Sequence, residues 1–145
     1  MSEIRTATFA ELDTRTAYLL WKLRGDVFVV EQECPYPELD GRDMEPATLH
    51  MWIEEHEVPV AYLRILEDGD IARIGRVVCN AGYRGKGYPT ALMNAAVERI
   101  GSRMSTLDAQ SYLTHWYERF GYRASGAEFL EDGIPHIPML RQPAS

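Results

Sequence analysis

The sequence predicts an α/β (α+β) fold, in which helices flank one mixed and twisted sheet of about six to seven strands. One reason is the turn Asp68-Gly69-Asp70, which lies between two strand patterns and is typical of an antiparallel hairpin. The other is a helical pattern over residues 89–103 between two further strand patterns, because a helical crossover is the usual connection between parallel strands. Both kinds of connection together predict a mixed sheet.

Seven segments have the alternation or the β-branched and aromatic composition of strands. They are residues 4–7, 49–53, 58–66, 71–79, 104–110, 122–130 and 134–140. The end of the fourth segment, Val77-Val78-Cys79, is apolar on both faces, as in a buried central strand.

The first helix is expected to begin near Thr8 or near Asp13. Thr8 and Glu11 have the spacing of a capping box, and Asp13 is a good N-cap by itself. Cys34-Pro35-Tyr36-Pro37 ends this helix, because proline cannot continue it. Residues 34–46 are polar and rich in acids, so they predict a loop.

Two more helices are expected in the second half of the chain. Pro89 suits the start of the longer one, because no hydrogen bond of an N–H group is lost at a first helical position. The shorter helix carries apolar residues at helical spacing, and Gly121 is placed to end it. These residues are Leu113, Trp116, Tyr117 and Phe120.

Length and composition predict a cytoplasmic protein of one domain, residues 1–145. The chain has the usual size of one domain, and 46% of its residues are hydrophobic. No apolar run approaches the roughly 20 residues that span a bilayer, and the first residues do not resemble a secretory signal. The net charge of −7 argues against nucleic-acid binding, which needs a basic surface, and is compatible with small cationic substrates.

Cys34 and Cys79 are expected to be free thiols, as cysteines in a cytoplasmic chain usually are. Covalent acyl-enzyme chemistry is not expected, because no Cys-His-Asx arrangement is evident. No cluster of cysteine and histidine has metal-ligand spacing, so no metal is predicted.

The segment Val77–Leu92 is the most informative part of the sequence. A buried strand ends, a turn with Gly85 and Gly87 follows, and a helix starts. The first N–H groups of a helix have no partner and lie at the positive end of the helix dipole. The glycines allow close approach and positive φ, while Arg84 and Lys86 add positive charge. The segment therefore predicts an anion site, although a turn that only connects strand to helix is the alternative.

Two familiar phosphate motifs do not fit this turn. The P-loop pattern G-x-x-x-x-G-K-[S/T] is absent. The dinucleotide pattern G-x-G-x-x-G is met only at Gly85 and Gly87, because Thr90 stands at the third glycine.

Residues 77–88 resemble the core motif of the GNAT family of N-acetyltransferases, a hydrophobic strand followed by R-x-x-G-x-G/A. The resemblance implies that the strand pairs with the pantetheine arm of coenzyme A and that the turn holds its pyrophosphate. The residues so implied are Val77, Val78, Cys79, Arg84, Gly85, Lys86, Gly87, Tyr88, Pro89 and Thr90. Pro89 departs from the family, which usually has Gly or Ala there, and it removes one N–H donor.

Residues 113–122 resemble a second family segment, roughly A-x-x-x-Y-x-x-x-G-F. Tyr117 occupies its tyrosine position, and the resemblance implies that it is the general acid that protonates the departing thiolate. A phenol can serve because this leaving group needs a nearby O–H donor. The alternative is a core aromatic, since Tyr117 lies on the apolar stripe of its helix.

Further segments are similar to the ElaA-like branch of the family: residues 23–36, 40–43 and 132–137. The resemblance covers about residues 20–139 and implies the GNAT fold, whose central strands splay apart near Val77 and Cys79. Pro135 and Pro138 are typical of an edge or irregular strand, so interrupted pairing is expected there.

The resemblance implies direct transfer of an acetyl group from acetyl-CoA to an amine, which must be neutral to attack. Glu31 is the leading candidate for the base, because this region borders the acceptor pocket in the family. His136 is second, because histidine titrates near neutrality. The alternatives are that Glu31 is a solvated helix-end carboxylate and that His136 only bonds a backbone carbonyl.

The expected function is therefore an acetyl-CoA-dependent N-acetyltransferase that acts on a small-molecule or peptide amine, with a homodimer as one possible assembly. Two alternatives stay open. One is an acyltransferase like the acyl-homoserine-lactone synthases, which share the fold and favour longer acyl donors. The other is a module that binds coenzyme A without turnover.

Overall fold

One eight-stranded sheet organises the computed structural model, which describes residues 3–142. The strand order is β1-β2-β3-β4-β5-β8-β6, and β7 also pairs with β8. Neighbouring strands are antiparallel except β4 and β5, which are parallel, so the predicted mixed sheet is confirmed. The strands are β1 (Ile4–Ala7), β2 (Leu49–Glu55), β3 (Val58–Asp68), β4 (Ile71–Cys79), β5 (Ser105–Gln110), β6 (Arg123–Ala124), β7 (Phe129–Glu131) and β8 (Ile134–Arg141).

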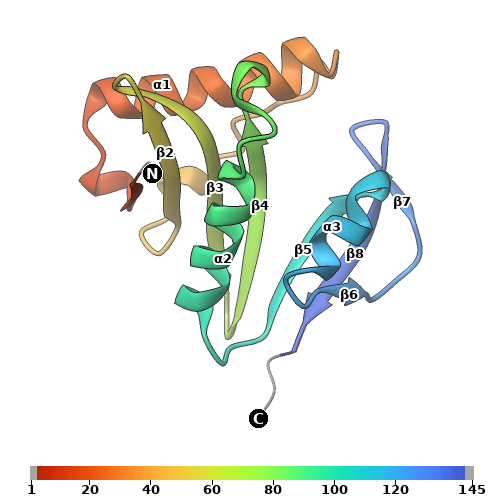
Figure 1. Ribbon diagram of the computed structural model, residues 1–145. Coiled ribbons are helices and arrows are strands. Elements are labelled where there is room, and N and C mark those ends of the chain that lie inside the picture. Colours follow the sequence, from red (N-terminus) through yellow and green to blue (C-terminus); the bar gives the residue numbers. More distant parts are fainter. Residues whose placement is uncertain (1–2, 143–145) are drawn as a thin grey trace.

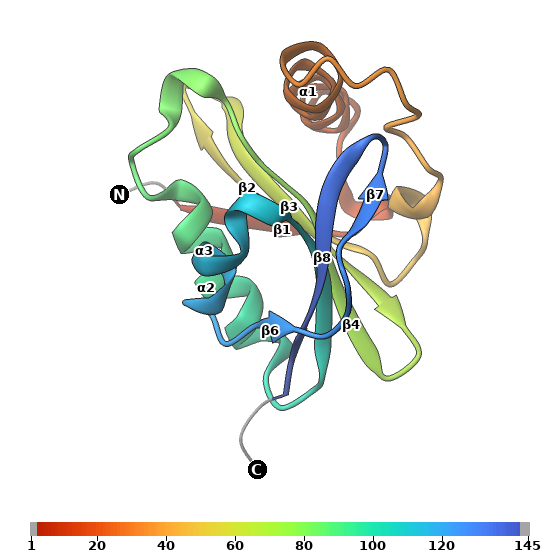
Figure 2. The ribbon, with the colours of Figure 1, turned by 90° about the vertical axis from the view of Figure 1, so that its right-hand side faces the viewer.

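Helices cover both faces of this sheet. The α-helices are α1 (Thr14–Arg24), α2 (Tyr88–Ile100) and α3 (Thr114–Glu118), and a π-helical segment, Gly25–Glu31, continues α1. Figure 2 shows α1 on one face, with α2 and α3 on the other. No helix in residues 3–142 has the length and hydrophobicity needed to cross a membrane.

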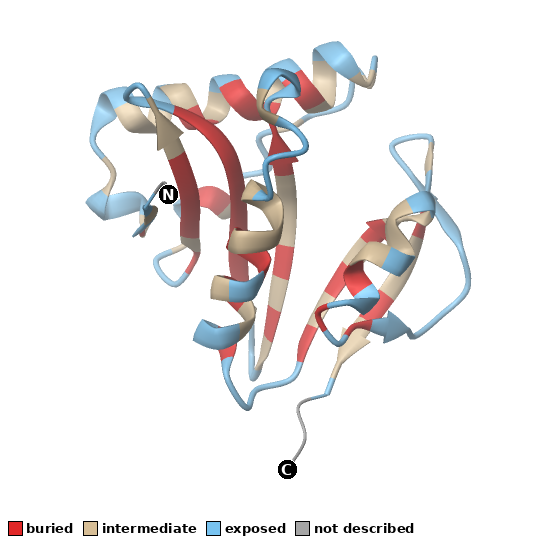
Figure 3. Ribbon diagram, viewed as in Figure 1, coloured by how far each residue is buried: buried red, intermediate tan, exposed pale blue. Residues whose placement is uncertain are grey.

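The apolar core lies in two layers, one on each face of the sheet (Figure 3). On one face, Leu20 and Leu23 of α1 pack against Trp52, Tyr62 and Val78. On the other face, α2 and the segment around α3 bury their apolar residues. These include Leu92, Met93, Ala96, Ile100, Tyr117 and Phe120. The sequence predicts a buried stripe of Leu20, Leu23, Val27 and Val30 in the first helix; the first three are buried, but Val30 is 70% exposed.

The start of the first helix follows both expected caps. The main-chain N–H of Thr8 donates to the Glu11 carboxylate at 2.8 Å, beside a short 3-10 helix, Phe9–Glu11. Asp13 then caps α1 by accepting from the Thr16 N–H at 2.7 Å. The chain therefore starts two helices here, and α1 itself begins after Asp13.

The central strands β4 and β5 separate after a short contact. They pair only at Ala72 with Ser105 and at Arg73 with Thr106, and Figure 1 shows them diverging from that end. A bulge in β4 contributes: the pairing with β3 shifts between Tyr62 and Arg64, and Arg76 has a φ of 55°. The predicted splay is confirmed, and its open side faces the ends of α1 and α2.

The predicted strand 122–130 is wrong as a single element. It forms β6 and β7, which pair with separate parts of β8, and this raises the strand count to eight. Between them the chain crosses Pro138 so closely that a Cβ at Gly126 would lie 2.9 Å from the proline ring. Ser125 donates its N–H to the Pro138 carbonyl at 2.8 Å, which keeps this crossing in place.

The expected interruption at Pro135 and Pro138 does not occur on the side facing β5. β8 pairs with β5 without a break from His136 to Arg141. The Pro138 carbonyl bonds Ser125, away from β5, so the proline nitrogen also points away and no bond to β5 is lost. Pro135 lies just beyond the last residue that pairs with β5.

Candidate functional site

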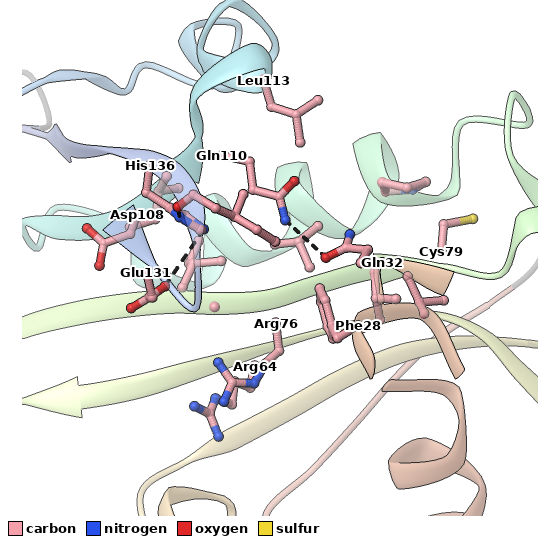
Figure 4. Close-up of a pocket in the computed structure, with 18 of the residues that line it drawn as sticks. Phe28, Gln32, Arg64, Arg76, Cys79, Asp108, Gln110, Leu113, Glu131 and His136 are labelled. Carbon is pink, nitrogen blue, oxygen red and sulfur yellow. Dashed lines mark hydrogen bonds and ion pairs between the residues drawn. The ribbon is translucent and has the colours of Figure 1, made fainter. Parts of the chain in front are cut away.

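A cavity of about 720 Å³ lies where β4 and β5 separate (Figure 4). The end of the π-helical segment, the loop after it, the turn before α2, α3 and the start of β8 also line it. Of the residues that the sequence singles out, only Lys86 and Tyr88 are not among those lining it. Those that do line it are Glu31, Val77, Val78, Cys79, Arg84, Gly85, Gly87, Pro89, Thr90, Tyr117 and His136.

The turn between β4 and α2 has the backbone that an anion site needs. Gly85 and Gly87 both have a φ of 81°, which only glycine adopts easily, and Gly87 is the N-cap of α2. A Cβ built on either glycine meets no atom within 4 Å, so the space beside the turn is open. Pro89 is the second residue of α2, where the N–H has no helical partner in any case.

The charged and aromatic side chains of this turn have protein partners. Arg84 donates to the Cys79 carbonyl at 3.1 and 3.0 Å and binds Glu31 with both outer nitrogens. The Lys86 ammonium lies 5.9 Å from the centre of the Tyr83 ring. The Tyr88 hydroxyl donates to Glu55. Anion binding at this turn would therefore use the backbone amides first.

Tyr117 of α3 is among the residues that line the cavity. Its side chain is buried, and no hydrogen bond joins its hydroxyl to another described residue. Burial raises the pKa of the phenol well above its usual value, so the group keeps its proton at neutral pH. The phenol is therefore in the protonated state that a proton donor needs.

Glu31 is bound to Arg84 in a two-pronged ion pair. The carboxylate oxygens accept from the guanidinium at 2.7 and 3.0 Å. Hydrogen bonding from Arg84 holds the pKa of Glu31 below its usual value. This pairing weakens Glu31 as a proton acceptor, because a lowered pKa means that the carboxylate binds a proton less readily.

His136 has one ring nitrogen occupied and the other available. Its Nδ1 lies 2.7 Å from the Ile134 carbonyl, which can only accept, so Nδ1 carries the hydrogen of a neutral ring. The other nitrogen, Nε2, then holds a lone pair and lies 3.7 Å from the Glu131 carboxylate (Figure 4). The histidine is buried at the wall of the cavity, so Nε2 can accept a proton there.

Sequence reasoning did not find several polar residues of the cavity. Arg73 of β4 pairs with Asp108 of β5 where the two strands begin to separate. Gln32 and Gln110 meet across the cleft at 3.4 Å (Figure 4), and the Cys34 thiol donates to the Asp132 carbonyl at 3.0 Å. For Arg73 and Asp108, the sequence did carry a signal, because each is a charged residue inside an otherwise largely apolar strand.

Both cysteines are free thiols, and both line the cavity. Burial raises the pKa of each thiol, so neither is activated as a nucleophile. Within residues 3–142, no group of His, Cys, Asp and Glu side chains is arranged to hold a metal ion.

Comparison with known proteins shows which family the chain belongs to. Residues 26–142 match the model of an acetyltransferase (GNAT) domain. The chain is 46% identical over 143 residues to a UPF0039 protein of Mycobacterium bovis, covering 95% of this chain and 92% of that one. It is 36% identical over 149 residues to protein ElaA of Escherichia coli, with 98% and 97% covered.

Solved structures agree with the sequence relatives. An acyl-CoA N-acyltransferase from Pseudomonas aeruginosa has a TM-score of 0.92 and 36% identity, covering 97% of this chain and 99% of that one. The AHL synthase LasI has a TM-score of 0.74 over 97% of this chain and 89% of its own, but only 16% identity. The likeness to LasI is therefore one of fold alone.

Proposed function

Because the chain belongs to the GNAT acetyltransferase family, we propose that it transfers the acetyl group of acetyl-CoA to the amine of a small molecule or peptide. One observation carries the proposal. The splayed end of β4, the glycine turn before α2 and the buried phenol of Tyr117 all line one cavity. In acetyl-CoA, the pantetheine arm, the pyrophosphate and the leaving sulfur each need one of these three partners.

The backbone supplies the binding groups for the acyl donor. Beyond Arg73, β4 has lost its pairing with β5, so its edge is free to bond the amides of a pantetheine arm. The first-turn N–H groups of α2 and the left-handed Gly85 and Gly87 form the cradle for a pyrophosphate. The phosphate contacts of this cradle come from the backbone.

Tyr117 and His136 would then move the two protons of the reaction. His136 Nε2 takes a proton from the attacking ammonium, which frees the lone pair for attack on the thioester carbonyl. The C–N bond forms and the C–S bond breaks, and Tyr117 donates its phenolic proton to the departing sulfur. The second proton of the nitrogen then returns to the Tyr117 phenolate, and His136 releases the first to solvent. The geometry favours His136 over Glu31 as the base, because Arg84 already holds the Glu31 carboxylate.

The charges of the cavity favour an acceptor that is itself cationic. Every arginine that lines it has a carboxylate partner. By contrast, within residues 3–142 the one ion-pair partner of Glu131 is His136, and Asp132 has none. The uncompensated charge is therefore negative, and the field at this end attracts an ammonium group.

Thiol release tests the proposal directly. Purified protein is incubated with acetyl-CoA and a panel of polyamines, amino acids and amine-bearing peptides, with acceptor-free reactions as the control. We expect acceptor-dependent release of coenzyme A, highest with cationic amines, and an acetylated product of matching mass. Turnover only with long acyl donors would replace the proposal with a homoserine-lactone type of reaction. Binding of coenzyme A with no release across the panel would leave a binding module.

A further inference from the structure

We propose that Glu38 is a positioning residue that couples the loop on the acceptor side of the cavity to the bulge in β4. Through this coupling, Glu38 is expected to raise the affinity for the acceptor and to leave the affinity for acetyl-CoA nearly unchanged. This consequence rests on the proposed function, whereas the coupling itself does not.

Glu38 is held by two guanidinium groups from different elements. Arg24 at the end of α1 and Arg76 in β4 both donate through Nε to the same carboxylate oxygen, at 2.8 and 2.7 Å. The same two arginines also donate to the Glu38 main-chain carbonyl, at 3.3 and 3.0 Å. Arg24 is fully buried and the Glu38 side chain is 14% exposed, and this partial burial strengthens the charge-assisted bonds.

The loop that carries Glu38 has little other means of keeping its shape. No helix or strand covers residues 32–41, yet Cys34, Tyr36, Glu38 and Asp40 all line the cavity. Neighbouring loop carboxylates make similar contacts, because Arg64 binds Asp40 with both outer nitrogens. The loop wall is therefore held in place mainly by ion pairs to the sheet and to α1.

The partner Arg76 occupies a strained position. Its φ of 55° is disfavoured for a residue with a Cβ, and such a conformation persists only where the surroundings enforce it. The Arg76 side chain contacts Glu38 and, at 3.5 Å, Asp40, and these contacts stabilise the position together with the bulged pairing to β3. The bulge at Arg76 lies beyond Arg73, the last residue of β4 that pairs with β5, so the loop contacts hold the bulge itself.

The geometry assigns the effect to the acceptor side. Glu38 is no part of the turn that would hold the pyrophosphate, and its guanidinium partners come from α1 and from the bulge. Replacing Glu38 by Gln removes one charge at nearly constant volume. Arg24 retains Asp43 at 2.7 Å and Arg64 retains Asp40, so we expect the loop to stay attached but to move more.

The test compares Glu38→Gln with Glu67→Gln. Glu67 forms an ion pair with Arg103 at 2.5 and 3.0 Å outside this cavity, so it is a matched control for the loss of one paired carboxylate. For Glu38→Gln we expect an acceptor KM raised about tenfold, with the acetyl-CoA Kd changed less than twofold. For Glu67→Gln both constants should match those of the wild type.

Hydrogen exchange tests the coupling without any turnover. Amides of residues 34–40 and 74–77 should exchange faster together in Glu38→Gln and not in Glu67→Gln. If Glu38→Gln does not fold, Arg76→Gln serves instead, because Arg24 still binds Glu38 in that variant, and the same two segments should respond.

Two results would overturn the inference. One is faster exchange in residues 34–40 with no change in residues 74–77. The other is a parallel loss of acceptor and acetyl-CoA affinity, which indicates general destabilisation. If the wild type acetylates no amine, the proposed function fails, and the exchange comparison alone decides whether Glu38 couples loop and bulge.

Discussion

At the scale of single residues, Tyr117 combines burial with an unbonded hydroxyl that lines the cavity. Tyr117→Phe should lower kcat about 100-fold and leave the acetyl-CoA Kd unchanged, because only the proton donor is lost. Steady-state kinetics and calorimetric titration with coenzyme A measure the two effects. Unchanged turnover across pH would remove Tyr117 as the acid.

Tyr122→Phe is the matched control for that variant. Its hydroxyl is also buried but bonds Ser105 at 2.6 Å, outside the cavity. Removing this bond should lower stability by about 1 kcal/mol and leave kcat unaffected. The pair of variants separates the loss of a proton donor from the loss of a buried hydroxyl.

The choice of base is also decided at single residues. His136→Gln should lower kcat/KM about 100-fold at neutral pH, with a smaller loss at pH 9, where more of the acceptor amine is already neutral. Glu31→Gln should change kcat/KM much less, because the carboxylate is bound to Arg84. A larger effect at Glu31 than at His136 would reverse this assignment.

At the scale of elements, the turn before α2 depends on left-handed glycines. Gly87→Val should abolish coenzyme A binding, because a β-branched side chain is strained at this φ and would fill the open space of the cradle. Binding is measured by calorimetry. Gly69→Val is the control, since Gly69 has a φ of 65° and open space around it in the distant β3–β4 turn. Retained micromolar binding by Gly87→Val would exclude this turn as the cradle.

The docking of α1 on the sheet provides a test of stability. Leu20→Ala should lower the free energy of unfolding by about 2–5 kcal/mol, because the side chain is fully buried against the sheet. Tyr18→Ala on the exposed side of the same helix should change it by less than about 0.5 kcal/mol. Urea denaturation of both variants measures the difference, and equal losses would contradict the packing of α1.

At the scale of the whole molecule, the buried His50 and Asp43 and the partly exposed Asp40 predict a loss of stability in acid. Burial lowers the pKa of His50, so below its ordinary value of about 6.5 protonation favours the unfolded chain. Hydrogen bonds from Arg64 lower the pKa of Asp40. Burial opposes ionisation of Asp43, but Arg24 and Arg64 outweigh it, and its pKa is lowered too.

The sign is the same for all three groups. Each binds protons more readily in the unfolded chain, so stability is greatest above pH 7 and falls as the pH decreases. His50 contributes the loss below about pH 6.5, and the two aspartates contribute a second loss below about pH 4. Urea midpoints from pH 8 to pH 3 measure both steps. Midpoints that stay constant from pH 7 to pH 3 would contradict the predicted role of these three groups.

Local patterns were sufficient for most of the elements. Apolar alternation, the Asp68-Gly69-Asp70 turn and the caps at Thr8 and Asp13 depend on neighbouring residues only, and the structure confirms them. The prediction of one strand over residues 122–130 was wrong. The segment divides into two strands where the chain passes Pro138, and no local sequence pattern encodes that contact. Pro138 keeps its pairing with β5 because its nitrogen lies on the other side of β8, and on that side the expected interruption does occur, between β6 and β7.

The sequence by itself determined the mixed fold, the family and the glycine turn, because these depend on residue type and short spacing. Only the tertiary structure decided how the acids and bases of the cavity are used. Arg84 reaches Glu31 across 53 positions and Arg76 reaches Glu38 across 38, so the partner of each charge depends on how the sheet and α1 meet. The same packing leaves His136 with one available nitrogen. A carboxylate and a histidine that look equivalent in sequence thereby acquire different chemistry, because hydrogen bonding sets the proton affinity of each group.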